Sequence, residues 1–296
     1  MDKKVLQAIT SEISTDSPAV LTTIINVSGS VPRHEGAQML IFPDGRSVGT
    51  IGGGCGEAEV RREALIALED NETKKYRVML NSDLAADEGM VCGGIMDVLL
   101  EPITQVTPYD KVLSSLENTE PAVLVTVIAS RVKKGIYATD GSKISGEDCK
   151  VEPGILAQVL KSGKACLKEN DRGESILYQP ILPEDKLLVL GAGHVGQYVA
   201  AFGKKLDFKV TVVDDRPDFA NSRRFPDADE IMCTDFGQAI EEYDTDQNTY
   251  IVIVTRGHQY DEACLRRVLG KPYKYLGMIG SRRRVKMLLS KLEKEG

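Results

Sequence analysis

The chain has 296 residues, of which 42% are hydrophobic and 27% charged, a composition typical of soluble globular proteins with room for two domains. Its formal net charge of −7 argues against binding to nucleic acid by general electrostatics. The first residues hold no apolar segment typical of a secretory signal, and no apolar run approaches the roughly 18 residues that a membrane helix needs. The six cysteines form no C-x-x-C pair, which favours reduced thiols. We therefore expect a cytoplasmic protein that binds neither membrane nor nucleic acid.

Residues 1–183 carry two copies of one sequence pattern. PAVLTTIINVSGS begins at Pro18, and PAVLVTVIASRVK begins at Pro121. The turn FPDGRSVGT is repeated as ATDGSKISGE, and the helical stretches EAEVRREALIAL and PGILAQVLKSGKACL follow the two turns. The strands DVLLEPI and SILYQPI close the two copies. Because neither copy could bury its apolar face alone, the repeat predicts a single α+β domain.

Three segments of the first copy have no counterpart in the second. They are GSVPRHEGAQ (29–38), GTIGGGCGE (49–57) and SDLAADEGMVCGG (82–94). Since the second copy does without them, we expect these loops to serve a ligand. A glycine run before a helix exposes N–H donors beside the positive end of the helix dipole, and both attract an anion.

Cys55 and Cys92 lie in two of these loops, each flanked by glycines, in surroundings that stabilise a thiolate. Arg33, in the remaining loop, could bind a phosphate or carboxylate through two N–H groups. Alternatively, the glycines only allow close packing, and both thiols are buried as small apolar groups. A zinc site of His34, Cys55 and Cys92 has suitable ligand types but matches no structural zinc spacing.

The second half, residues 184–296, alternates short apolar strands with helices, as a parallel doubly wound sheet does. A strand over 187–190, a helix over 194–206 and a strand over 210–213 form its first βαβ unit. The glycines between the first strand and the helix have the G-x-G-x-x-G spacing, which suits a tight turn, a close approach to pyrophosphate and close helix packing: Gly191, Gly193 and Gly196.

Further strands are expected within 230–234, 249–258 and 275–280. Ligands of such sheets bind at the carboxyl ends of the strands, where this sequence places polar residues. These residues are Asp214, Asp215, Arg216, Thr255, Arg256, Gly257, His258, Ser281 and Arg282. Asp214 could bind a ribose hydroxyl and Arg216 a 2′-phosphate, so NAD and NADP both remain open.

Several blocks of the chain, in order, resemble the XdhC/CoxI family of accessory factors for molybdenum hydroxylases. They are GSVPRHEGAQMLIFPDGRSVGTIGGGCGEAEV, GMVCGGIMDVLLEP, LVLGAGHVG, VVDDRPDFANSRRFPDADE, VIVTRGHQYDEACLRRVL and GMIGSRRRVKMLL. The resemblance implies a chaperone more than an enzyme with its own turnover. Such a protein binds the molybdenum cofactor, as molybdopterin or its dinucleotide form, supports its sulfuration by a cysteine desulfurase, and delivers it to an apo molybdenum hydroxylase such as xanthine dehydrogenase. It also implies a homodimer.

The resemblance also assigns site residues. Cofactor binding falls to Arg33, Gly53, Gly54, Glu57, Gly93, Gly94, Gly191, Gly193, Gly196, Asp214, Arg216, His258 and Ser281. We hypothesise that Cys55 and Cys92 contact the molybdenum or carry sulfur in transit. The resemblance further implies two domains, 1–183 and 184–296. We expect the second to be truncated, because members of the family continue past the helix that ends near Lys294. An NAD(P)-dependent oxidoreductase and a scaffolding protein are the alternatives.

Overall fold

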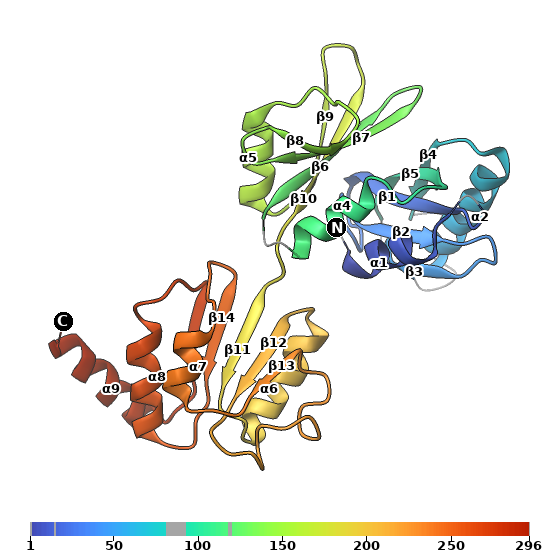
Figure 1. The fold of residues 1–296 in the computed structure, drawn as a ribbon. Coiled ribbons are helices and arrows are strands. Elements are labelled where there is room, and N and C mark those ends of the chain that lie inside the picture. Colours follow the sequence, from blue (N-terminus) through green and yellow to red (C-terminus); the bar gives the residue numbers. More distant parts are fainter. Residues whose placement is uncertain (1, 15, 81–92, 118–119, 296) are drawn as a thin grey trace. The chain divides into compact units, whose positions relative to one another are not determined.

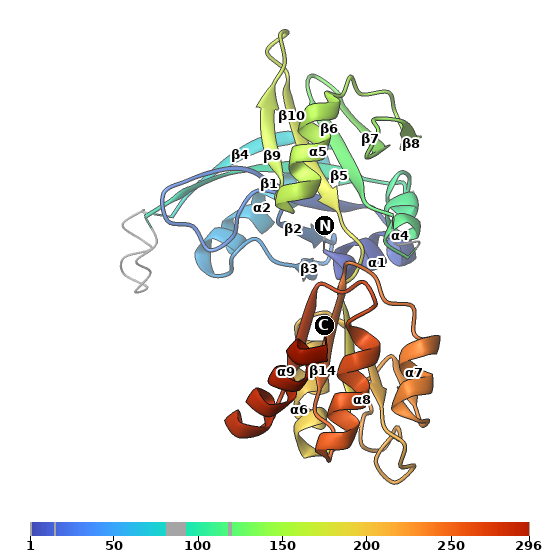
Figure 2. The same ribbon diagram turned by 90° about the vertical axis from the view of Figure 1, so that its left-hand side faces the viewer.

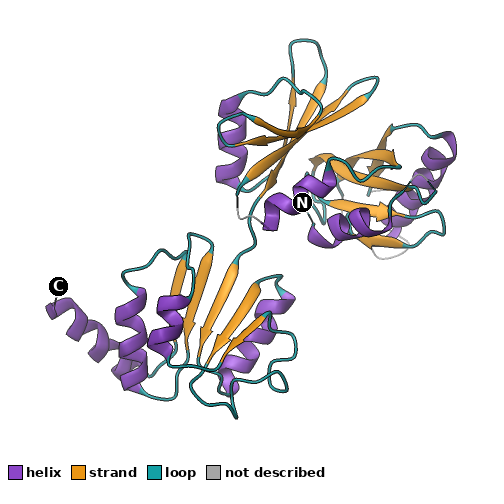
Figure 3. Cartoon of the chain, in the orientation of Figure 1, coloured by secondary structure: helices purple, strands orange, loops and turns teal. Residues whose placement is uncertain are grey.

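The structure, a computed structural model, describes residues 2–14, 16–80, 93–117 and 120–295 (Figure 1). The contacts within it divide the chain into two compact units, Met1–Pro183 and Glu184–Gly296. Each unit combines helices and strands, as Figure 3 shows. Among the described residues, no helix is both long enough and apolar enough to cross a membrane.

The first unit consists of two copies of a three-strand, one-helix, two-strand pattern, each preceded by a short helix. Its elements are α1 (Lys3–Glu12), β1 (Ala19–Ser28), β2 (Gln38–Ile41), β3 (Ser47–Gly49), α2 (Gly54–Asp70), β4 (Lys74–Met79), β5 (Ile95–Ile103), α4 (Tyr109–Glu117), β6 (Ala122–Ile128), β7 (Val132–Ala138), β8 (Lys143–Gly146), α5 (Pro153–Ser162), β9 (Cys166–Glu169) and β10 (Ser175–Ile181).

The strand orders confirm the internal repeat. The described strands form one sheet with the order β3-β2-β1-β5-β4 and another with the order β8-β7-β6-β10-β9, and their pairs are antiparallel. The hairpin turns agree in detail. Gly45 and Gly141 have φ of +81° and +87°, and the preceding Asp44 and Asp140 each accept a backbone hydrogen bond from two residues ahead. The two turns therefore use the same chemistry: an Asx turn followed by a glycine with positive φ.

Two details of the predicted repeat are wrong. Each copy has a short strand after its long helix that the sequence pattern did not indicate: β4 in the first and β9 in the second. The predicted helical stretch PGILAQVLKSGKACL is helical only to Ser162, because Gly163 has a φ of +65° and caps the helix. Its last residues, from Cys166, belong to β9.

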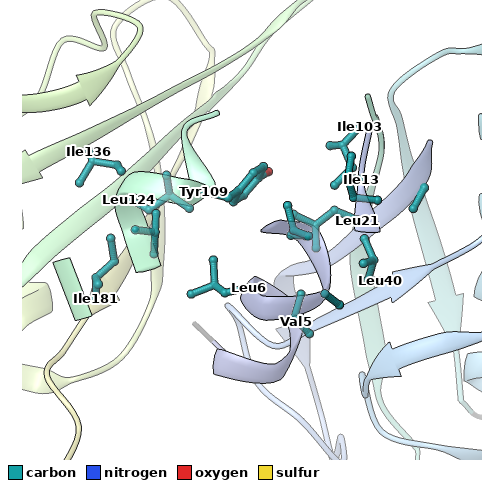
Figure 4. Close-up of a cluster of buried hydrophobic side chains, with 14 of the residues drawn as sticks. Val5, Leu6, Ile13, Leu21, Leu40, Ile103, Tyr109, Leu124, Ile136 and Ile181 are labelled. Atoms are coloured by element: carbon teal, nitrogen blue, oxygen red, sulfur yellow. The ribbon is translucent and has the colours of Figure 1, made fainter. Parts of the chain in front are cut away.

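The two copies share a hydrophobic core. Side chains from both contribute to one buried cluster, including Leu6 of α1, Leu21 of β1, Leu124 of β6 and Ile181 of β10 (Figure 4). Each copy also packs its own long helix on the other face of its sheet, with Val60 and Ala64 of α2 buried in the first copy. The sequence inference that neither copy buries its apolar surface alone is therefore supported by the packing.

A buried ion pair crosses between the copies. Lys134 of β7 donates to Glu101 of β5 at 2.5 Å and to the hydroxyl of Tyr109 in α4 at 2.5 Å. The side chains of Lys134 and Glu101 are 8% and 12% exposed. Burial opposes the charge of Lys134, but the attraction of Glu101 prevails and raises the pKa of the lysine.

The second unit confirms the doubly wound parallel sheet. Its elements are β11 (Lys186–Leu190), α6 (His194–Lys205), β12 (Lys209–Val213), β13 (Glu230–Met232), α7 (Phe236–Glu242), β14 (Thr249–Ile253), α8 (His258–Val268), β15 (Tyr275–Met278) and α9 (Arg282–Glu295). The described strands follow the order β13-β12-β11-β14-β15, and every pair is parallel. Figure 2 shows α6 on the opposite side of this sheet from α7 and α8. The order reverses beside β11, where such folds bind their ligands.

Candidate functional site

The three loops found only in the first copy meet at one end of its sheet, as far as they are described. A Cβ atom on Gly29 would lie 3.1 Å from the carbonyl oxygen of Gly93, and one on Gly94 would lie 2.5 Å from that of Ser30. A Cβ on Gly52 would collide with the ring of Pro32. The loop that follows β1 thus packs against both of the others, and glycines make this contact possible.

Glu57 closes the glycine loop that precedes α2. One carboxylate oxygen, Oε1, accepts hydrogen bonds from the hydroxyl of Thr50 at 2.5 Å and from the backbone N–H groups of residues 51, 52 and 53 at 3.0, 3.2 and 2.8 Å. Burial tends to raise the pKa of Glu57, but these hydrogen bonds outweigh it and lower the pKa below its usual value. The carboxylate is therefore ionised at neutral pH and satisfies the donors of this loop itself.

The start of α2 follows directly. Gly52, Gly53 and Gly54 have φ of +138°, +80° and +66°, a region that favours glycine, and no side chain caps the helix. Cys55 lies in the first turn, half-buried and outside any disulfide. Residues 81–92 lie outside the described part of the chain, and Cys92 is among them. The expected proximity of the two thiols therefore stays a prediction.

The three loops carry several exposed groups. Arg33 presents an exposed side chain in the loop after β1, and Gly53 and Gly93 are exposed backbone. A Cβ on Gly53 or Gly93 would meet no described atom within 4 Å. The site therefore combines a cation, accessible backbone and a thiol, which can accommodate an anionic ligand that also carries a soft metal. His34 is exposed, and the described residues contain no group of three or more metal-binding side chains.

The second copy arranges the segment before its long helix differently. Gly146 matches Gly49: each has positive φ, and a Cβ on either would lie 2.5 Å from a carbonyl oxygen of the neighbouring strand. Beyond Gly146, the hydroxyl of Tyr137 accepts from the N–H of Cys149 at 2.6 Å and donates to its carbonyl at 2.8 Å. Cys149 is 2% exposed, and burial raises the pKa of its thiol. The first turn of α5 also contains no cysteine, so no thiol of the second copy corresponds to Cys55.

In the second unit, the three glycines of the turn between β11 and α6 differ in what they do. Gly191 has a φ of +124°, and a Cβ there would lie 2.5 Å from the carbonyl of Val254. A Cβ on Gly196 would collide with the carbonyl of Gly191. Gly193 is the N-cap of α6, and a Cβ on it would meet no described atom within 4 Å. Two glycines therefore serve packing, and Gly193 alone leaves open space in front of the backbone.

Asp214, at the end of β12, is buried and fully engaged. Its Oδ2 accepts from the N–H of Ala192 at 2.9 Å and from Nη2 of Arg216 at 3.0 Å, and its Oδ1 accepts from Nε of Arg216 at 2.8 Å. Burial tends to raise the pKa of Asp214, but the bonds from Arg216 and Ala192 outweigh it and lower the pKa. Asp214, the residue expected to bind a ribose, therefore holds the glycine turn in this structure.

The sequence analysis missed three residues at this edge: Gln197, Arg224 and Tyr260. Arg224 donates to the side chain of Gln197 at 2.9 Å. Tyr260 accepts a hydrogen bond from Arg256, which also forms a two-pronged ion pair with Asp215 at 2.5 and 2.8 Å. The arginine pair in the segment SRRFPDADE was the available signal for Arg224.

For the two remaining predicted residues, His258 and Ser281, the structure gives a position along the chain. His258 is the first residue of α8, and its side chain lies outside the described part of the structure. Ser281 is exposed just before α9. In the first unit the structure brings together the loops that carry the predicted residues, through Gly94 and Ser30 and through Gly52 and Pro32, and it joins Glu57 to Gly53. In the second unit it gathers Gly191, Gly193, Gly196, Asp214 and Arg216.

Comparisons with known families and proteins match both units. A family model described as the XdhC and CoxI family matches residues 13–79, and one described as the XdhC Rossmann domain matches residues 187–296. A curated protein of Bacillus subtilis, named as a probable subunit of xanthine dehydrogenase, is 30% identical over 279 residues, covering 92% of this chain and 82% of that protein.

Two further relatives come from Escherichia coli and Bacillus halodurans. The molybdenum cofactor insertion chaperone PaoD of Escherichia coli is 30% identical over 122 residues, covering 41% of this chain and 38% of PaoD. A crystal structure of a xanthine dehydrogenase from Bacillus halodurans superposes with a TM-score of 0.83 at 27% identity, covering 97% of this chain and 84% of that one.

Proposed function

The chain belongs to the XdhC and CoxI family, and from this premise we propose that it is an accessory factor that binds the molybdenum cofactor on behalf of a molybdenum hydroxylase. Relatives carry names that fit such a role: one is a probable subunit of xanthine dehydrogenase, and another is a molybdenum cofactor insertion chaperone. The cofactor is cargo in this account, and the client enzyme uses it.

One observation carries the proposal: the first copy of the repeat places a thiol and glycine-rich loops at the start of its long helix, and the second copy does not. Cys55 lies in the first turn of α2, and the loop that carries the exposed Arg33 packs through Pro32 against Gly52. In the second copy the first turn of α5 holds no cysteine, and Cys149 is buried before the helix, bound through its backbone to Tyr137. Since both copies share one fold, the difference is not needed for folding, and it supports a ligand site in the first copy.

The chemistry of the site suits this cargo. Molybdopterin bears a phosphate, which a guanidinium such as that of Arg33 can bind. Its molybdenum is held by sulfur, and a thiol such as that of Cys55 is a ligand type that such a soft centre accepts. Arg33 would bind the phosphate end, and Cys55 would contact the metal end or accept sulfur. Glu57 keeps the loop between them in shape, because its carboxylate holds three successive N–H groups.

We extend the proposal to delivery and sulfuration. The protein would hold the cofactor while a cysteine desulfurase provides its terminal sulfido ligand, and would then pass it to an apo molybdenum hydroxylase such as xanthine dehydrogenase. Cys92 is included in this step as a second sulfur carrier, although it lies outside the described residues. A homodimer is proposed on the resemblance alone.

The test is activation of an apo-hydroxylase. The protein is purified from a host that makes the cofactor, then mixed with the apo form of a xanthine dehydrogenase, and the activity that appears is measured. We expect Arg33→Ala to lower the activation at least tenfold. Arg131→Ala is the matched control, because Arg131 is an exposed arginine between β6 and β7, the equivalent loop of the second copy. Equal activation by Arg33→Ala and the control would contradict the assignment of the site.

A further inference from the structure

The fold of the second unit is typical of domains that bind a dinucleotide. In such domains the acid after the second strand is expected to bind the ribose. In folds of this kind, a carboxylate at that position accepts hydrogen bonds from the ribose hydroxyls. Asp214 occupies the position here, at the end of β12 and 22 residues from Ala192 in the glycine turn. Whether it fits a ribose depends on whether its oxygens are accessible.

The carboxylate oxygens of Asp214 are not accessible. The residue is 1% exposed, and each of these oxygens already accepts at least two hydrogen bonds. Three of these bonds come from Arg216, through its backbone N–H, Nε and Nη2, and the fourth comes from the N–H of Ala192. The guanidinium binds the carboxylate with two parallel N–H groups, which is the strongest geometry available to this pair.

The surroundings of Arg216 hold it over the carboxylate. Its guanidinium carbon lies 3.6 Å from the centre of the Phe219 ring, and the guanidinium carbon of Arg224 lies 5.0 Å from the same ring. The neighbouring acid, Asp215, is bound by Arg256 in the same two-pronged way. Each of the two acids after β12 therefore has its own arginine.

A dinucleotide would have to displace these contacts. A ribose hydroxyl is a neutral donor, so it would replace a charge-assisted bond from Arg216 with a weaker one and would leave a partly buried guanidinium without its partner. The 2′-phosphate of NADP meets a related obstacle. The guanidinium expected to bind it is already shared with Asp214, and the carboxylate of Asp215 lies close enough to act on Arg216 electrostatically.

We propose that Asp214 anchors the glycine turn of this unit and that Arg216 closes the ribose position, so that neither NAD nor NADP binds through Asp214. Arg216 is then the residue that decides which ligands the turn excludes. The inference concerns the second unit alone, and the cofactor site proposed in the first unit stands or falls independently of it.

The test measures NADH and NADPH binding to the full-length protein by calorimetry and nucleotide fluorescence. Wild type is expected to show no saturable binding at concentrations up to about 1 mM. Arg216→Leu frees the Asp214 carboxylate, and we expect it to bind NADH at least tenfold more tightly than wild type. Arg223→Leu is the matched control, since Arg223 is an exposed arginine of the same loop, and it should behave as wild type.

Asp214→Asn tests whether Asp214 holds the glycine turn or binds a ribose. It should leave NADH binding at the wild-type level while lowering the thermal midpoint, because the turn loses its anchor. Should Arg216→Leu fail to fold by circular dichroism, Arg216→Gln replaces it with the same expected gain. Saturable NADH binding by wild type that Asp214→Asn weakens tenfold would overturn the proposal. So would a folded Arg216 variant with no gain in affinity.

Discussion

At the scale of single residues, two carboxylates define how the loops of this protein are held. Glu57 binds the N–H groups of the glycine loop before α2, and Asp214 binds the glycine turn before α6. Both are ionised at neutral pH, because hydrogen bonds lower the pKa of each. In both units a nearby carboxylate therefore accepts hydrogen bonds from backbone N–H groups of a glycine-rich loop.

Replacing Glu57 tests this at the residue scale. We expect Glu57→Gln to lower the free energy of unfolding by about 1–2 kcal/mol at neutral pH, because the loop loses charge-assisted hydrogen bonds. Urea denaturation measures the loss. Glu69→Gln, an exposed change in the same helix, is the control and should alter stability by less than about 0.5 kcal/mol.

The pH dependence of this loss has a defined sign. The pKa of Glu57 is lower in the folded state, so its contribution is present above the unfolded-state pKa of about 4.3 and disappears as the pH falls through the folded-state value. The difference between wild type and Glu57→Gln should therefore narrow below about pH 4.3. A difference that stays constant down to about pH 3 would show that the charge of Glu57 does not hold the loop.

The contacts of these two residues could not be predicted from the sequence. Sequence reasoning singled out Glu57 and Asp214, and it assigned both to a ligand. The same letters are compatible with binding a ribose or binding Arg216 two residues later, because only the side-chain positions decide between them. Cys92, which the sequence pairs with Cys55, falls outside the described residues and remains a prediction.

At the scale of elements, the two copies are tied together by the pair of Lys134 and Glu101, which joins β7 of one to β5 of the other. Lys134→Met leaves Glu101 buried without its partner, so we expect a loss of about 3–5 kcal/mol in the free energy of unfolding. The double variant with Glu101→Leu should recover most of this, because neither charge then remains. Denaturation followed by circular dichroism measures both.

The exposed pair of Arg77 and Asp97 provides the comparison for that experiment. Their shortest ion-pair distance is 2.7 Å, but the side chain of Arg77 is 65% exposed. Arg77→Met should therefore cost less than about 1 kcal/mol. If Lys134→Met cost no more than Arg77→Met, the buried pair would not be what joins the two copies.

Elements with a strong pattern were predictable, and short ones were not. The apolar runs of β1 and β6, together with the repeated turns at Gly45 and Gly141, were sufficient to identify the repeat. The strand β9 has four residues, CLKE, of which leucine, lysine and glutamate are good helix formers. Its conformation is set by pairing with β10 and by Gly163, which ends the helix.

At the scale of the whole molecule, one chain combines a duplicated α+β unit with a Rossmann-type unit, and the family comparison covers both. The two copies share one scaffold, and the first also carries glycine-rich loops that contact one another. In the second unit the glycine turn is retained, but its acid is bound by Arg216. Both observations favour a protein that holds a cofactor for a client over one that turns over a dinucleotide.

The most direct measurement is the molybdenum and pterin content of the full chain purified from a host that makes the cofactor. We predict close to one molybdenum and one pterin per site for wild type and for Cys233→Ala, whose exposed cysteine lies in the other unit. Cys55→Ala should retain at least tenfold less. Equal content in the Cys55→Ala and Cys233→Ala proteins, or none in wild type, would contradict the account.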